Sequence, residues 1–239
     1  MLWDSIISGF SVLGSWQFWV ASLSFSAIFI LLFLALGLGL AKSMESGRTA
    51  PLGCLAGMIL PTILQVVFIS MLVVFLLPIL MGGDEVTPIS YLSDEWWKIV
   101  KAGFFGFIIL MIIAFLPIVG ELATNTPGVS VFVIGMVIFH RLVGSTLRHI
   151  QELNDVKIDL TPGIWTIIGF VILAAIIVWA LTFLIIAVLK FIGIVDEEIM
   201  ESGALFLGPA IGAIPGLIAL AVYISYVMLT LRQEINLNH

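Results

Sequence analysis

Long uncharged apolar stretches alternate with short polar segments along most of the chain. A helix needs about 20 mainly apolar residues to cross a hydrocarbon core roughly 30 Å thick. The stretch from Ile164 to Leu189 is apolar on every helical face, whereas the strands of a membrane barrel alternate in polarity. The pattern therefore predicts an all-α, polytopic helical membrane protein with about six transmembrane helices, at residues 18–41, 51–81, 99–119, 128–146, 163–194 and 205–231.

The first sixteen residues have a different pattern, in which apolar residues recur at helical spacing between serines and an aspartate. The apolar positions are Trp3, Ile6, Ile7, Phe10 and Leu13. Tryptophan favours the headgroup level of a membrane. We expect residues 1–16 to form an interfacial amphipathic helix that lies along the membrane, with a partner-binding helix as the alternative.

Three parts of the chain depart from a simple pattern of spans and short loops. The stretch 51–81 is long and contains Pro51, Pro61 and Pro78, which predicts one broken or tilted span, or a span with a re-entrant piece before Pro61. Residues 82–97 are polar and predict a loop, and the fourth span is expected to continue as a surface helix through Leu153. Because no long linker divides the chain, residues 1–239 are expected to form a single integral membrane domain.

Composition narrows the class of protein. Of all residues 62% are hydrophobic and only 10% are charged, against roughly 25% charged in a soluble domain. The net charge of −6 and the scattered basic residues argue against nucleic acid as a partner. Basic residues favour cytoplasmic loops, and cytoplasmic N- and C-termini place six inside (Lys98, Lys101, Arg141, Arg148, Lys157 and Arg232) and three outside (Lys42, Arg48 and Lys190).

Enzyme chemistry has little support in the sequence. It contains no HExxH, GxSxG, Walker or CxxC motif, and its one cysteine, Cys54, excludes an intrachain disulfide. His140 and His149 are nine residues apart, too far along a helix to share a metal ion. We therefore expect no enzymatic activity, no cofactor and no metal.

A few polar residues interrupt the spans. Gln65 and Thr62 share a helix face in the second span, and Glu121 follows the third. These residues either line a pathway or serve structural roles, as an interhelical hydrogen bond or an interface carboxylate. His140 and Arg141 form either a polar pathway wall or a lipid-headgroup site; the alternative is that Arg141 reaches the interface by extending along the helix.

One tetrapeptide occurs twice: Met44–Gly47 is repeated as Met200–Gly203. Each copy precedes a segment rich in glycine and proline, namely Gly53, Gly57 and Pro61, and then Gly208, Pro209, Gly212, Pro215 and Gly216. Such paired segments occur at transporter binding sites, whereas glycines spaced four apart also serve plain helix packing. We expect 208–216 to be irregular and to face the protein interior, so that Gly212→Leu is far more disruptive than Leu220→Ala.

Two functions remain for a non-enzymatic multi-pass membrane protein. The first is a pore or transport protein that passes a small solute or ion, supported by the broken spans and by carboxylates at both faces. The alternative is a structural or accessory subunit of a larger membrane protein complex. The expected partners are the lipid bilayer and either further copies of the chain or other membrane subunits.

Overall fold

Helices make up nearly all of the part of the chain that the computed structural model describes, which comprises residues 2–45, 50–80, 90–115, 127–154, 164–193 and 213–230. These residues contain no strand, which confirms the all-α class for the described ranges. The helices are α1 (Leu2–Phe10), the 3-10 helix η1 (Ser11–Gly14), α2 (Trp16–Glu45), α3 (Ala50–Leu80), α4 (Ser90–Ala114), α6 (Pro127–Asn154), α7 (Ile164–Phe191) and a C-terminal helix, Ala213–Thr230.

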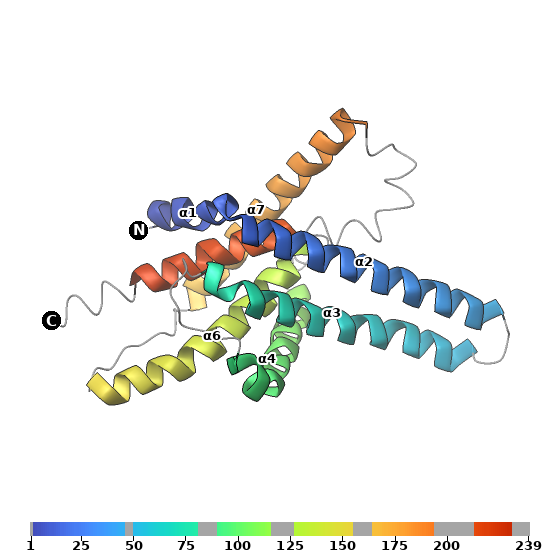
Figure 1. Cartoon of the computed structure of the whole chain (residues 1–239), viewed down its shortest axis with the longest axis horizontal. Helices are drawn as coiled ribbons and strands as arrows, with labels where there is room; N and C mark the ends of the chain where they lie inside the picture. Colours follow the sequence, from blue (N-terminus) through green and yellow to red (C-terminus); the bar gives the residue numbers. More distant parts are fainter. Residues whose placement is uncertain are drawn as a thin grey trace.

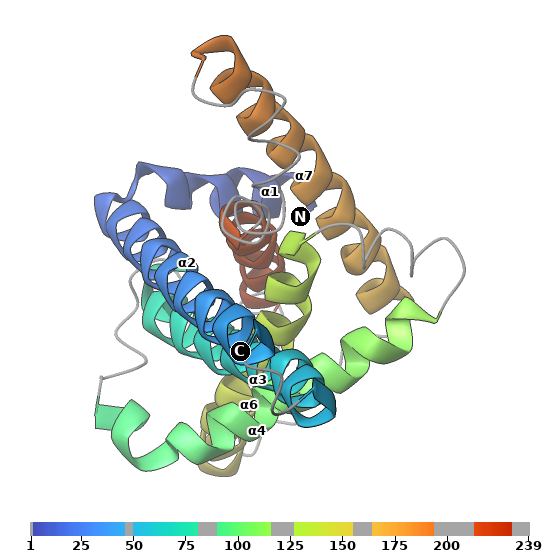
Figure 2. The same cartoon turned by 90° about the vertical axis from the view of Figure 1, so that its right-hand side faces the viewer.

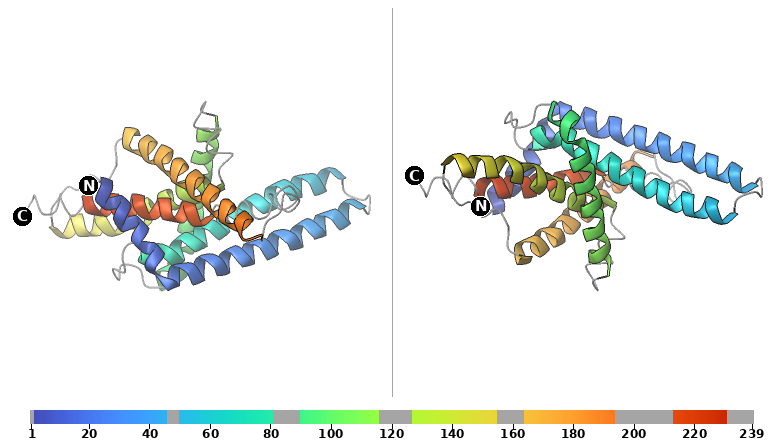
Figure 3. Two further views of the ribbon diagram at one scale, coloured as in Figure 1. Left: turned by 90° about the horizontal axis from the view of Figure 1, so that it is seen from above. Right: turned by 90° about the horizontal axis from the view of Figure 1, so that it is seen from below.

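The C-terminal helix is the centre of the arrangement. Viewed along the longest axis of the molecule, it is surrounded by α1, α2 with α3, and α6 (Figure 2). Helices α2 and α3 run side by side and extend together to one end of the molecule (Figure 1). Helix α4 crosses α6 steeply, and α7 projects away from the other helices (Figure 3).

The N-terminal region turns sharply before the first long helix. The axis of Leu2–Gly14 makes an angle of 74° with that of Trp16–Ile28. The indole Nε1 of Trp19 donates a hydrogen bond of 2.9 Å to the carbonyl oxygen of Leu13, which ties the two sides of this corner together. Residues 1–16 were expected to form a helix separate from the first span, and the structure has α1 and η1 there.

Glycines permit the closest helix contacts. A Cβ atom at Gly106 of α4 would lie 2.9 Å from the Cα of Ile134 in α6, and one at Gly103 would overlap the Ser70 hydroxyl of α3. A Cβ atom at Gly9 of α1 would lie 2.6 Å from the backbone of Val222 in the C-terminal helix. Small residues allow backbones to approach in this way in membrane helix bundles.

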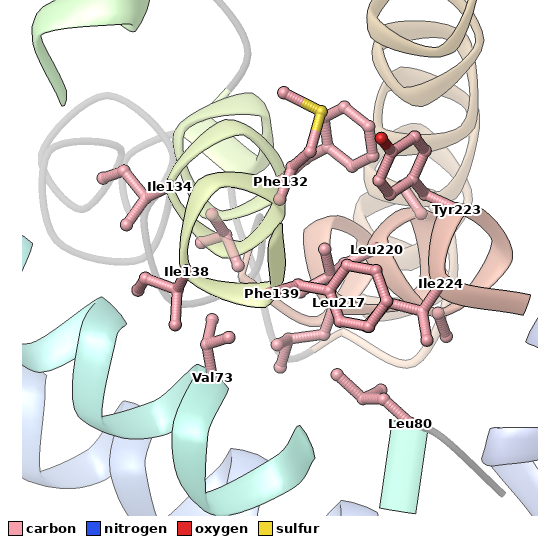
Figure 4. Close-up of a cluster of buried hydrophobic side chains, with 14 of the residues drawn as sticks. Val73, Leu80, Phe132, Ile134, Ile138, Phe139, Leu217, Leu220, Tyr223 and Ile224 are labelled. Carbon is pink, nitrogen blue, oxygen red and sulfur yellow. The ribbon is translucent and has the colours of Figure 1, made fainter. Parts of the chain in front are cut away.

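The core is apolar and is built mainly from α3, α6 and the C-terminal helix. Its labelled members in Figure 4 are Val73, Leu80, Phe132, Ile134, Ile138, Phe139, Leu217, Leu220, Tyr223 and Ile224. Within the described ranges the buried residues other than hydrophobic ones and glycine include three serines, Ser5, Ser22 and Ser70. The Ser70 hydroxyl donates to the Val66 carbonyl one turn earlier at 2.7 Å, so its polarity is satisfied inside α3.

The number of candidate membrane spans is smaller than the sequence predicted. Two described helices are long and apolar enough to cross a membrane, Trp165–Phe191 and Ala213–Thr230, and a third is counted if the bent pair Leu2–Gly14 and Trp16–Ile28 forms one span. Shorter apolar helical segments are Ile63–Leu77 and Gly128–Arg141. These helices indicate a membrane protein, but six spans are not confirmed.

Two details of the sequence prediction differ from the structure. The stretch 51–81 was expected to be one broken or tilted span, or a span with a re-entrant piece before Pro61; α3 is one continuous helix of 31 residues, so the broken and re-entrant alternatives are wrong. Pro51 lies in its first turn, where an amide donor is not needed, and the loss of one donor at Pro61 does not interrupt the helix. The loop expected at 82–97 ends earlier, since α4 begins at Ser90. Polar residues do not end a helix by themselves, and the helix-breaking Gly82, Gly83 and Pro88 all precede Ser90.

The fourth and fifth spans agree better with the structure. Helix α6 continues without a break to Asn154, as the apolar spacing through Leu153 predicted. Helix α7 covers most of 163–194 and ends near Gly193, whose φ of 77° is the left-handed conformation that glycine adopts readily. The amide of Gly193 donates to the Lys190 carbonyl at 3.1 Å and closes the last turn.

Candidate functional site

A histidine and a tyrosine form the main polar contact between α6 and the C-terminal helix. The Nε2 atom of His140 lies 2.5 Å from the hydroxyl oxygen of Tyr223, within hydrogen-bond distance. Tyr223 is fully buried, whereas His140 is partly buried. The contact joins residues that are 83 positions apart in the sequence.

Aromatic rings surround this pair. Phe132, Phe170 and His140 each meet the Tyr223 ring edge to face, with centroid distances of 5.8, 5.1 and 5.6 Å. Phe170 of α7 also contacts Tyr226, one turn after Tyr223, at 4.8 Å. Because edge-to-face contacts are favourable and directional, the cluster fixes the orientation of the Tyr223 ring. Figure 4 shows the Phe132 side chain beside Tyr223.

Two glycines bring the helices close enough for this contact. A Cβ atom at Gly135 of α6 would lie 2.5 Å from Leu220 Cδ2 and 3.3 Å from Val73 Cγ2. A Cβ atom at Gly216 would overlap the carbonyl oxygen of Gly128. A larger residue at Gly216 would push the helices apart because the obstacle is backbone, whereas one at Gly135 would displace the Leu220 side chain. Both glycines therefore favour the short distance across which His140 reaches Tyr223.

Arg141 lies beside this pair but points elsewhere. Its side chain is exposed, whereas Phe139 on the other side of His140 is fully buried. Among the residues whose side chains the structure describes, none forms an ion pair with Arg141.

The remaining polar candidates do not join this site. Gln65 is partly buried beside Val66, and it makes no hydrogen bond with any described residue. Thr62 is part of α3, but its side chain lies outside the described part, as does the whole of Glu121. Among the predicted polar residues, therefore, the structure gives a side-chain partner only for His140 within the ranges it describes.

The glycine and proline candidates fall into two groups. Gly53, Gly57 and Pro61 belong to the continuous helix α3, and their surroundings lie outside the description. Gly208, Pro209 and Gly212 are also outside it. Pro215 and Gly216 are helical and buried in the C-terminal helix, so the irregular backbone expected for 208–216 is wrong for these two residues.

Neither a metal centre nor a known relative identifies the site. No group of three His, Cys, Asp or Glu side chains among the described residues is arranged to hold a metal ion. The chain matches no protein-family model, no curated protein and no solved structure. A function must therefore be argued from the geometry alone.

Several residues of this site were not predicted from the sequence. Tyr223 was missed, although it and Tyr226 are two of only three tyrosines and stand one turn apart in an apolar stretch. Gly103, Gly106 and Gly135 were missed as contact residues as well. Glycine is unfavourable inside a helix, and each occurrence within an apolar span was a usable signal of close helix packing.

Proposed function

We propose that the protein is a non-enzymatic, multi-pass membrane protein that acts as a subunit of a larger membrane assembly, with α7 packed against another membrane helix. The observation that carries this proposal is the exposure of α7. It is the more apolar of the two helices that are long and apolar enough to cross a membrane, with a mean hydropathy of 3.0. Only 22% of its most apolar 18-residue stretch is buried. For the C-terminal helix the corresponding share is 61%.

The fully buried side chains of α7 all precede Trp179, although the partly buried Leu181 also packs against the core. Phe170, Ala174 and Val178 are buried against the core. No side chain between Trp179 and Phe191 is buried, and Trp179 stacks on Phe183 at 6.0 Å with both rings more than half exposed. The side of this half that carries Trp179, Phe183 and Leu184 is therefore open to lipid or to another protein.

Small residues favour a protein along the exposed side of α7. Gly169, Ala180 and Ala187 are all exposed, and their separations of eleven and seven residues place them on one face of α7. A Cβ atom at Gly169 would meet nothing within 4 Å. In lipid there is no hydrophobic drive for helices to associate, and small residues mark the faces where backbones pack closely. A lipid-facing surface has no such need for them.

The packing of the core also favours a subunit over a pore. Apart from the His140–Tyr223 pair, the described residues at the centre of the bundle are mainly apolar, and the Ser70 hydroxyl is bonded within its own helix. Passage of an ion requires polar groups or water along its path. The described residues at the centre of the bundle supply few polar groups for such a path.

The proposal includes six spans with both termini in the cytoplasm. Helices α2 and α3 have 30 and 31 residues, so each is about 45 Å long and exceeds the thickness of a hydrocarbon core. The placement of α1 and the last turn of the C-terminal helix at one end of the molecule (Figure 1) is in keeping with termini on one side. The excess of basic residues assigned to that side supports the cytoplasm.

A pore or transport protein is the second candidate. The observation in its favour is the His140–Tyr223 pair, a titratable group hydrogen-bonded inside an apolar bundle. Ionisable residues at such positions often belong to transport pathways. Gln65 on α3 is the other polar group that this function would use.

Native mass spectrometry of the protein extracted from its source membrane in lipid nanodiscs distinguishes these functions. The subunit proposal predicts a fixed-stoichiometry complex with another membrane protein, which is lost when Gly169, Ala180 and Ala187 are all replaced by leucine. A matched triple leucine variant on α4, at Phe105, Ile108 and Ile112, should keep the complex because these exposed residues are already large. A homo-oligomer, retained in both variants, would instead favour the pore.

A further inference from the structure

The ionisable residues of α6 begin at His140 and Arg141. The helix runs from Pro127 to Asn154 and carries no Asp, Glu, Lys, Arg or His before His140, whereas Arg148, His149 and Glu152 follow Arg141. His140 and Arg141 therefore mark the point where the helix leaves the hydrocarbon core. The partly exposed Tyr226 packs against Phe170 at the same aromatic cluster, and tyrosine also favours this level of a membrane.

The contact with Tyr223 determines whether the other ring nitrogen of His140, Nδ1, can donate a hydrogen bond to a second partner. A phenol hydroxyl buried among aromatic rings must donate its proton to an acceptor, and the Nε2 atom of His140 is the acceptor within reach. A neutral imidazole that accepts at Nε2 carries its proton on Nδ1. Within the described ranges Nδ1 has no hydrogen-bond partner, so His140 presents an N–H donor on the side away from Tyr223.

Arg141 adds a second set of donors from the next position in the helix. Its exposed guanidinium has five N–H groups, and no residue whose side chain is described supplies an anion for it. A guanidinium at the edge of the hydrocarbon core needs a counter-charge, and lipid phosphates at that level provide one. Guanidinium binds phosphate oxygens in a bidentate manner that a lysine cannot reproduce.

We propose that His140 and Arg141 form a binding site for the phosphate group of an anionic phospholipid at the membrane interface. The Arg141 guanidinium binds two phosphate oxygens, and the Nδ1–H of His140 donates to the same group. Tyr223 is a positioning residue, because it holds the imidazole in the tautomer that can donate.

The test measures lipid binding to the purified full-length chain in neutral detergent by native mass spectrometry. Phosphatidylglycerol is titrated against phosphatidylcholine, and inorganic phosphate is titrated in a separate series. Arg141→Gln is expected to weaken phosphatidylglycerol binding at least about tenfold, since a charge-assisted hydrogen bond is lost. Lys98→Gln, which removes an exposed positive charge from α4, is the matched control and is expected to change binding little.

The positioning role has its own pair of variants. Tyr223→Phe is expected to weaken phosphatidylglycerol binding severalfold, whereas Tyr226→Phe leaves it unchanged, because among described residues only Tyr223 bonds to His140. Equal phosphatidylglycerol affinity in Arg141→Gln and the unaltered protein would overturn the site. Displacement of the lipid by millimolar inorganic phosphate would show a site for free anions and would also overturn the proposal.

Discussion

The carbonyl oxygen of Gly128 in α6 lies against Gly216 of the C-terminal helix, so close that a Cβ atom at residue 216 would overlap it. The obstacle is backbone, which cannot move aside as a flexible side chain can. We expect Gly216→Ala to lower the free energy of unfolding by about 1–3 kcal/mol, the usual cost of overpacking a close contact.

Thermal unfolding in detergent measures this effect, with Gly169→Ala as the control. A Cβ atom at Gly169 would meet nothing within 4 Å, and alanine is the better helix former. Equal midpoints for Gly216→Ala and the unaltered protein would show that the two helices do not pack as closely as described.

Leu220 is a second test of the same helix contact. The sequence alone predicted only that Leu220→Ala is far less disruptive than Gly212→Leu; in the structure Leu220 is fully buried and its Cδ2 fills the space beside Gly135. A buried leucine-to-alanine change costs about 2–5 kcal/mol because it leaves a cavity. We therefore expect Leu220→Ala to unfold well below the unaltered protein, and Leu184→Ala on the exposed part of α7 to unfold close to it.

The hydrogen bond between His140 and Tyr223 should contribute measurably to stability. Tyr223→Phe removes the hydroxyl and leaves Nε2 of His140 without its partner, which is expected to cost about 0.5–1.5 kcal/mol. Tyr226→Phe is the control, since Tyr226 contacts the cluster through its ring. Chemical unfolding of both variants in one detergent checks this prediction, and a Tyr223→Phe midpoint at or above that of Tyr226→Phe would refute it.

The attachment of α1 depends on Gly9. A Cβ atom at this position would lie 2.6 Å from the backbone nitrogen and Cα of Val222, so Gly9→Val should detach α1 from the C-terminal helix. Faster amide hydrogen exchange in residues 2–10 is the expected result, with no change in α6. Gly14→Val is the control because a Cβ atom there would meet nothing within 4 Å. If exchange in α1 is equally slow in both variants, the contact with Val222 does not hold the helix.

The secondary structure was largely predictable because long apolar stretches admit little except helices in a membrane. The limits of α7 and the continuation of α6 to Asn154 followed from apolar spacing. The expected interruptions of helices did not follow from the sequence. Pro61 and Pro215 were expected to interrupt helices but lie within them, and the polar residues 90–97 were expected to be a loop but are part of α4. Proline costs a single donor, or none in a first turn, and polar residues are compatible with a helix.

Only part of the candidate site could be predicted from the sequence. His140 and Arg141 were noticeable because ionisable residues are rare in apolar stretches. The Tyr223 contact could not be predicted, because it joins helices far apart in the chain, and their crossing is set by Gly135 and Gly216 through local shape rather than by any repeated pattern.

Photo-crosslinking from position 183 in the native membrane tests the subunit proposal most directly. A benzophenone amino acid replaces Phe183 of α7, and the same replacement at Phe105 of α4, a phenylalanine of similar exposure, is the control. The account predicts a single crosslinked protein from position 183 that is absent from position 105. Adducts with lipid alone from both positions would contradict it, because α7 would then face the bilayer and not another subunit.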